Sequence, residues 1–227
     1  MGNLISASGA ASWVYGLQDV DRAIDQTLKE HEKHERAKLD ASLRVAKREH
    51  VEGAKPGHEP VPVLSWLYLG DRYTIRDQEA LRNARIAYVL QVSNVETPEE
   101  VKAELKAADI RQYLRLPAED VETDNIIMEF DKACDFIDLG KKAWDSGDEY
   151  HRVLVYCDEG VSRSPTMVLA YLLHQGWTLK GAVHYLKRLR PAIAPNKGFF
   201  EQLLEREHDL FGRNTLSASD YNKLFLE

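Results

Sequence analysis

One stretch of the chain, residues 153–166, constrains the fold more than any other. It reads Val-Leu-Val-Tyr-Cys-Asp-Glu-Gly-Val-Ser-Arg-Ser-Pro-Thr. The first four residues are apolar or β-branched, which predicts a buried strand that stops at Cys157. A short loop follows, and Pro165 is typical of the first turn of a helix. The residues from there to Gly176 are almost uniformly apolar, so we expect this helix to be buried and central.

This order of strand, loop and helix directs backbone amides and the positive end of a helix dipole at Cys157, which favours a bound oxyanion and a thiolate. The thiol of a cysteine in such a setting can have a pKa of roughly 3.5 to 7.5 instead of about 8.5. Gly160 allows the loop to turn, and the planar fork of Arg163 can hold two phosphate oxygens at once. A lone buried cysteine is ordinarily a small core residue, but Gly160, Arg163 and Pro165 together favour a functional site.

The pattern Cys157-x5-Arg163-Ser164 resembles the signature of the cysteine-dependent protein phosphatases, and residues 160–166 are similar to the dual-specificity branch. The resemblance runs from about Pro62 to Phe211. It includes a Leu-Tyr-Leu-Gly unit at 67–70 and a closing segment from Arg190-Pro191 through Asn196. It implies an α/β fold with a central mixed, mostly parallel sheet flanked by helices.

The resemblance also implies roles for the residues of this stretch. Cys157 would be the nucleophile that forms a cysteinyl phosphate, and Ser164 would stabilise the departing thiolate. The mechanism needs no metal ion or other cofactor. The phosphate would be bound by the loop that contains Asp158, Glu159, Gly160, Val161, Ser162 and Arg163.

A loop dense in carboxylates, residues 116–124, is the expected source of the proton donor. A phosphate monoester needs its leaving oxygen protonated as the P–O bond breaks, and a carboxylic acid on a loop opposite the thiolate can do this. Asp120 matches the family position, while Glu119 and Asp124 remain alternatives. Asp124 could instead cap the helix expected at 126–143.

One position departs from the family pattern, since Tyr156 stands where the family nearly always has histidine before the nucleophile. A phenol can donate one hydrogen bond but cannot become cationic, so it supports a thiolate less than an imidazolium does. We therefore expect an active but slower enzyme.

The acidic side chains of Asp158 and Glu159 would repel a multiply charged inositol head group, which favours a phosphoprotein substrate. The expected activity is hydrolysis of phosphotyrosine and phosphoserine/phosphothreonine. Two alternatives stay open. One is a weakly active or inactive phosphatase-fold module that binds phosphoresidues, and the other is a lipid or glucan phosphatase on the same fold.

The 227 residues suffice for one catalytic domain with extensions. We expect a flexible N-terminus at 1–18, a helical extension at 19–52, a Gly/Pro-rich linker at 53–61, the catalytic domain at 62–212 and a tail with a short helix at 213–227. Within the domain we expect strand and turn at 63–70, helix at 77–83, strand at 87–92, helix at 99–107, strand at 110–116 and helix at 126–143. A helix capped by Thr178 should end at Arg190-Pro191, and a last helix should follow Pro195.

Charge and cysteine content bear on partners and compartment. The net charge of −7 without a basic stripe argues against nucleic acid as the main partner. The two cysteines, Cys134 and Cys157, lack the spacing of a disulfide scaffold, and a reduced Cys157 implies a cytoplasmic location. Cys134 suits a packed helix core better than a resolving role. His31 and His34 lack a third ligand, so we predict no metal site.

The first six residues, Met-Gly-Asn-Leu-Ile-Ser, fit the pattern for N-myristoylation at Gly2. One myristoyl chain binds a membrane with K of only about 10⁴ M⁻¹, so a second signal would be needed. The locally basic segment at 36–48 is a weak electrostatic candidate for that signal.

Overall fold

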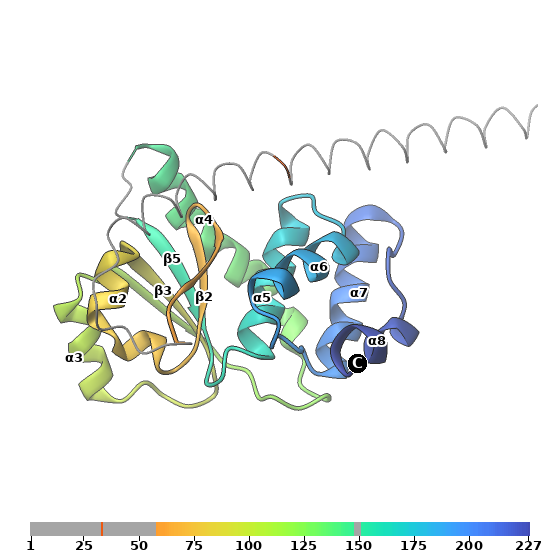
Figure 1. Ribbon diagram of the computed structural model, residues 1–227, viewed down its shortest axis with the longest axis horizontal. Helices are drawn as coiled ribbons and strands as arrows, with labels where there is room; N and C mark the ends of the chain where they lie inside the picture. Colours follow the sequence, from red (N-terminus) through yellow and green to blue (C-terminus); the bar gives the residue numbers. More distant parts are fainter. Residues whose placement is uncertain (1–32, 34–57, 148–150) are drawn as a thin grey trace, which may run out of the picture.

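The computed structural model describes residues 33, 58–147 and 151–227, and Figure 1 shows their arrangement. Several predictions concern residues outside this part of the chain. They are the acylation of Gly2, the flexible start at 1–18, the helical extension at 19–52 apart from Lys33, the linker as far as residue 57, and the pair His31 and His34.

The centre of the domain is a five-stranded sheet with strand order β1-β2-β5-β3-β4. β1 is antiparallel to β2, and the β2–β5, β5–β3 and β3–β4 pairs are parallel. The prediction of a mixed, mostly parallel sheet is therefore confirmed. The strands are β1 (Val61–Leu64), β2 (Leu67–Gly70), β3 (Ile86–Val92), β4 (Gln112–Leu116) and β5 (Arg152–Tyr156).

The segment expected as one strand and a turn at 63–70 forms two strands instead. β1 and β2 make a hairpin in which Leu64 pairs with Leu67 across the turn at Ser65 and Trp66. The sequence prediction was wrong here because this turn contains none of the Gly, Asn, Asp or Pro residues that usually mark a two-residue hairpin.

Helices cover both faces of the sheet (Figure 1). α2 (Gln78–Asn83) and α3 (Glu99–Ala107) lie on one face, while α4 (Phe130–Asp145) and α5 (Arg163–His174) lie on the other. α6 (Leu179–Leu189) and α7 (Lys197–Phe211) pack beyond α5, and α8 (Tyr221–Phe225) lies near the C-terminus. Short 3₁₀ turns precede α2, α4 and α8 at Thr74–Arg76, Ile126–Glu129 and Ala218–Asp220. The helices predicted within residues 58–147 and 151–227, including the short one in the tail, are confirmed.

β5 lies in the middle of the sheet and divides its side chains between two cores. Val153 and Val155 belong to the large core around α5, whereas Leu154 and Tyr156 belong to the smaller core under α2 and α3. This alternation follows from the two-residue repeat of a strand. α5 is buried from Ser164 to Leu173, so the prediction of a central helix is confirmed. In the described part of the chain, no helix is both long and apolar enough to cross a bilayer.

Helix ends follow the predicted local chemistry. Thr178 accepts a hydrogen bond from the Gly181 amide and begins α6, and the Asn196 side chain does the same for α7 with the Phe199 amide. Gly176 has a φ of +88° directly after the end of α5, a conformation that glycine adopts at little cost.

Candidate functional site

Cys157 directly follows the last residue of β5, and α5 begins six residues later at Arg163. The cysteine is 2% exposed, and its sulfur accepts a hydrogen bond from the Ser164 hydroxyl at 3.1 Å. Ser164 lies in the first turn of α5, where the helix dipole is positive. The sulfur therefore lies beside both a hydrogen-bond donor and a field that favour a negative charge.

The loop between Cys157 and α5 is held from outside by its carbonyl groups. These accept hydrogen bonds of 2.8 to 3.1 Å from the amides of Arg72 and Ala194 and from the guanidinium of Arg190. No residue in the described chain accepts a hydrogen bond from the amides of residues 159–163. These amides are therefore available as donors to a bound anion.

The turn in this loop requires a glycine. Gly160 has a φ of +66°, and an added Cβ would lie 2.7 Å from the carbonyl oxygen of Gly70 and 2.9 Å from Nη2 of Arg190. The loop thus packs closely against the end of β2 as well as turning sharply.

Arg163 is the cation of the site, and its side chain is only 11% exposed. Its Nη2 donates to Oδ2 of Asp158 at 2.7 Å, and its Nη1 lies 3.5 Å from the Ala118 carbonyl oxygen. Burial lowers the pKa of Arg163, but the hydrogen bond to Asp158 and the negative charges of Cys157, Asp158 and Asp120 raise it overall, so the guanidinium stays charged. Its Nε is buried without a hydrogen-bond partner among the described residues, so it can donate to a ligand.

Among the predicted proton donors, the structure brings Asp120 to the loop. Its Oδ1 accepts hydrogen bonds from the Ser162 hydroxyl at 2.6 Å and from Nδ2 of Asn196 at 3.0 Å. Its Oδ2 lies 3.9 Å from Nε of Arg163. Asp120 is therefore hydrogen-bonded to the loop that begins at Cys157.

The other two candidate proton donors, Glu119 and Asp124, contact each other within the same loop. The Asp124 carboxylate accepts a hydrogen bond from the Glu119 amide at 3.0 Å, which closes the loop on itself. The alternative in which Asp124 caps the following helix is wrong, because its carboxylate is used inside the loop. Asn125 holds the cap position of the 3₁₀ turn, and Glu129 holds that of α4.

Asn196 contacts both the loop and Asp120, although the sequence indicated it only as part of a closing segment. Its amide donates to the Ser162 hydroxyl oxygen at 3.1 Å, its side chain donates to Asp120, and its Oδ1 caps α7. The only local signal was an asparagine directly before a helix, which indicates a cap but not a contact with a distant loop.

Arg190 and Asp71 form a second support that the sequence did not reveal. Nη2 of Arg190 bonds both the Asp71 carboxylate at 3.2 Å and the Glu159 carbonyl oxygen at 3.0 Å. Burial raises the pKa of Asp71, but hydrogen bonds from Thr74, His58, Tyr73 and Arg190 lower it overall. The buried carboxylate stays charged and anchors Arg190 under the loop.

Tyr156 points into the layer of the sheet opposite to Cys157. It belongs to the core under α2 and α3, whereas Cys157 belongs to the core around α5. Burial, followed by the charge and hydrogen bond of Tyr113, raises the pKa of Tyr156, and its hydroxyl also bonds Thr97. Tyr113 and Thr97 both donate to Oε1 of Gln91. The phenol is thus part of a polar cluster away from the sulfur.

Cys134 is packed inside α4 and is 2% exposed. Burial raises the pKa of its thiol to about 12, so it stays protonated at neutral pH. Within residues 58–147 and 151–227, no three His, Cys, Asp or Glu side chains gather closely enough to hold a metal ion.

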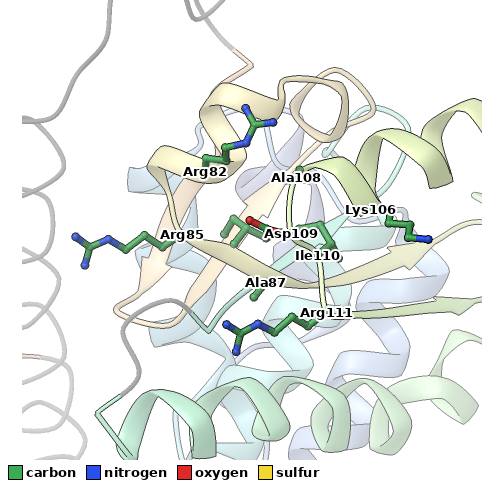
Figure 2. Close-up of a pocket in the computed structure, with 9 residues that line it drawn as sticks. Arg82, Arg85, Ala87, Lys106, Ala108, Asp109, Ile110 and Arg111 are labelled. Atoms are coloured by element: carbon green, nitrogen blue, oxygen red, sulfur yellow. The ribbon is translucent and has the colours of Figure 1, made fainter.

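A separate hollow of about 580 Å³ lies at the end of the sheet opposite to Cys157, where β3 and β4 begin. Arg82, Arg85, Lys106 and Arg111 line it together with Asp109. Figure 2 shows Arg85 and Arg111 extending to one side of the hollow and Lys106 to the other. Its lining is therefore cationic.

Comparisons with known proteins agree with this geometry. A family model described as "Dual specificity phosphatase, catalytic domain" matches residues 67–209. Dual specificity protein phosphatase 5 of Rattus norvegicus is 39% identical over 152 residues, which cover 66% of this chain and 36% of that protein. Dual specificity protein phosphatase Mpk3 of Drosophila melanogaster is 35% identical over 153 residues, which cover 66% and 34%. The chain thus spans about a third of the length of these curated relatives.

Solved structures give the same result. Human DUSP28 has a TM-score of 0.57 at 28% identity, and the match covers 67% of this chain and 98% of that one. A mouse putative dual specificity phosphatase complexed with zinc tungstate has a TM-score of 0.59 at 28% identity, covering 71% and 96%. With a matching catalytic-domain model over more than half of its length, the chain belongs to the dual specificity phosphatase family.

Proposed function

We propose that this chain is a protein phosphatase that hydrolyses phosphotyrosine and phosphoserine/phosphothreonine through a cysteinyl-phosphate intermediate. The observation that carries the proposal is the arrangement around one loop. The Cys157 sulfur accepts from Ser164, Arg163 lies buried and charged beside it, and Asp120 is hydrogen-bonded to Ser162.

In the first step the Cys157 thiolate attacks phosphorus, so that a P–S bond forms while the P–O bond breaks. Asp120 transfers its proton to the leaving oxygen. Oδ1 of Asp120 already accepts two hydrogen bonds, so Oδ2 is the oxygen that carries this proton. Arg163 and the loop amides bind the equatorial oxygens, and this fixed field provides most of the rate gain.

In the second step a water molecule attacks the cysteinyl phosphate. The Asp120 carboxylate takes a proton from that water as the new P–O bond forms and the P–S bond breaks. The Ser164 hydroxyl, 3.1 Å from the sulfur, donates a hydrogen bond that stabilises the departing thiolate. Phosphate is released and the thiolate is regenerated.

The acidic edge of the loop supports a phosphoprotein as substrate. Glu159 is exposed, and Asp158 is half-buried beside Arg163. Two carboxylates at the entrance disfavour a head group that carries several phosphates. A panel of phosphopeptides against phosphoinositides tests this choice, and faster hydrolysis of the phosphoinositides would contradict it.

Turnover of 4-nitrophenyl phosphate tests the activity itself, with Cys157→Ser and Asp120→Ala in parallel. We expect Cys157→Ser to abolish turnover and Asp120→Ala to lower kcat by about 10²-fold. A wild-type chain that binds phosphopeptides without turnover would instead be a phosphoresidue-binding module.

We further propose a cytoplasmic protein that attaches to membranes through a myristoylated Gly2. The cationic hollow supports a second, electrostatic contact with anionic lipid, since each Lys or Arg near such a surface contributes about 1 kcal/mol. Intact mass of the chain made in eukaryotic cells tests the acylation.

Sedimentation with phosphatidylserine vesicles tests the membrane contact. We expect Arg82→Glu with Lys106→Glu to weaken binding of the acylated chain about tenfold more than Lys132→Glu with Lys142→Glu, which makes the same charge change on exposed positions of α4. Equal losses from the two pairs would remove the hollow from the proposal.

A further inference from the structure

The C-terminal segment, residues 213–227, lies beyond the matched residues 67–209 and is attached to the domain at both of its ends. Near its start, the amide and hydroxyl of Thr215 donate to the fully buried Glu207 at 2.8 and 2.7 Å. Near its end, Nζ of Lys187 donates to the Leu224 carbonyl oxygen at 2.6 Å. The segment is thus an ordered part of the structure.

Tyr221 belongs to this segment, and aromatic packing and one hydrogen bond fix its position. Its ring centroid lies 5.7 Å from that of Phe200 and 5.3 Å from that of Phe225. Its hydroxyl donates to the carbonyl oxygen of Pro195 at 3.0 Å. Tyr221 therefore contacts the backbone directly before Asn196.

The peptide at Pro195 lies between two contacts with the candidate active site. On one side the Ala194 amide donates to the Val161 carbonyl oxygen at 2.8 Å. On the other side Asn196 donates to the Ser162 hydroxyl oxygen and to Asp120. A displacement of the Pro195 carbonyl would consequently be transmitted to Asp120.

The pKa of Tyr221 also indicates that this residue lies near the loop that carries Asp120. Burial, followed by the negative charges of Glu122 and Asp120, raises the pKa of Tyr221. The phenol is therefore within electrostatic range of the loop that carries the acid, and it remains a hydrogen-bond donor at neutral pH.

We propose that Tyr221 is a positioning residue for the general acid. By fixing the Pro195 carbonyl it holds Asn196 against Asp120, so the C-terminal segment completes a site whose reacting groups all lie elsewhere. This inference rests on the proposed role of Asp120 as proton donor.

The nature of the leaving group provides a selective readout. Phenolate is a poorer leaving group than 4-nitrophenolate, so phenyl phosphate depends more strongly on protonation by Asp120. A misplaced acid should lower kcat/KM, which reports formation of the cysteinyl phosphate, mainly for phenyl phosphate, whereas general loosening of the fold should lower kcat/KM equally for both substrates.

The experiment uses the full chain with Tyr221→Phe, which removes only the hydroxyl. We expect kcat/KM for phenyl phosphate to fall about 5- to 10-fold and kcat/KM for 4-nitrophenyl phosphate to fall less than about twofold. Tyr185→Phe is the matched control, because it removes another tyrosine hydroxyl that donates to a backbone carbonyl, that of Val63 at 2.6 Å. The control should leave the ratio of the two kcat/KM values unchanged.

Asp120→Asn, measured in parallel, distinguishes failure of the proton-donor assignment from failure of the positioning role of Tyr221. If Asp120→Asn leaves the ratio unchanged, the proton-donor assignment is wrong and this inference is lost with it. If Asp120→Asn changes the ratio and Tyr221→Phe does not, or if Tyr221→Phe lowers both rates equally, the positioning role alone is overturned.

Discussion

Arg163 donates to Asp158 at 2.7 Å, so the cation that should bind the substrate phosphate is already paired with a carboxylate five residues earlier in the chain. A phosphate must share or displace this partner. We therefore expect Asp158→Asn to tighten binding of tungstate or inorganic phosphate, because a charged hydrogen bond that competes for Arg163 becomes a neutral one.

Asp158→Asn should lower the competitive inhibition constant of tungstate or inorganic phosphate about three- to tenfold, measured against hydrolysis of 4-nitrophenyl phosphate. Glu159→Gln is the control, since it removes the same charge from the neighbouring, exposed position. If both variants lower the inhibition constant to a similar extent, the effect comes from overall charge and not from the contact with Arg163.

Gly198 determines how closely α7 approaches the loop that carries Asp120. A Cβ added there would lie 1.9 Å from the carbonyl oxygen of Glu122, so the backbone of the loop must move. We expect Gly198→Ala to lower kcat for phenyl phosphate at least about tenfold while Cys157 is still alkylated at the wild-type rate. Gly181→Ala in α6 is the control, since its added Cβ would lie 3.1 Å from Oγ1 of Thr178. Unchanged kcat in Gly198→Ala would mean that the loop tolerates the shift.

Tyr156→Phe tests whether the phenol supports the thiolate. Because Tyr156 faces the layer opposite to Cys157 and bonds Tyr113 and Thr97, we expect the pH midpoint of Cys157 alkylation by iodoacetate to move by less than about half a unit. The free energy of unfolding should fall by about 1–2 kcal/mol through the lost hydrogen bonds. An upward shift of a full unit in the midpoint would show that the phenol does act on the sulfur.

Cys134 should make the folded state sensitive to alkali. Burial raises the pKa of its thiol from 9.0 to about 12, so the unfolded chain loses this proton first as the pH rises. The contribution of this thiol to the free energy of unfolding is therefore fully present below about pH 9. It is lost towards pH 12, at about 1.4 kcal/mol per pH unit.

The difference between wild-type and Cys134→Ala urea denaturation curves at pH 8 to 11 isolates this contribution from that of Tyr and Lys. We expect the variant to be less stable at pH 8 because of the cavity, and the gap to narrow as the pH rises. Parallel curves would show that the thiol does not titrate in this way.

The elements with strong local patterns were predictable from the sequence. The apolar run before Cys157 indicated β5, and the helix expected at 99–107 coincides with α3 (Glu99–Ala107). Hydrophobic period and capping residues determine such segments locally. The hairpin turn at Ser65 and Trp66 was missed because tertiary packing and not turn chemistry stabilises it.

The residues of the candidate site likewise include some that local spacing predicts and others that only the folded chain brings together. Cys157, Arg163 and Ser164 lie within eight residues, so their spacing alone indicated a phosphate-binding loop. Asp71 and Arg190 are 119 residues apart and meet only in the folded chain. Asn196 likewise lies 76 residues from Asp120. Contacts of this range leave no periodic signal, so a single sequence cannot reveal them.

The placement of Tyr156 and Cys157 in the cores on opposite sides of the sheet has a practical consequence for chemical probes of this protein. A reagent that occupies the phosphate loop reports on the layer that contains α5, and a spectroscopic label at position 156 reports on the layer beneath α2 and α3. Two adjacent positions in the chain therefore provide two independent sensors, one for ligand occupancy and one for the integrity of the far side of the sheet.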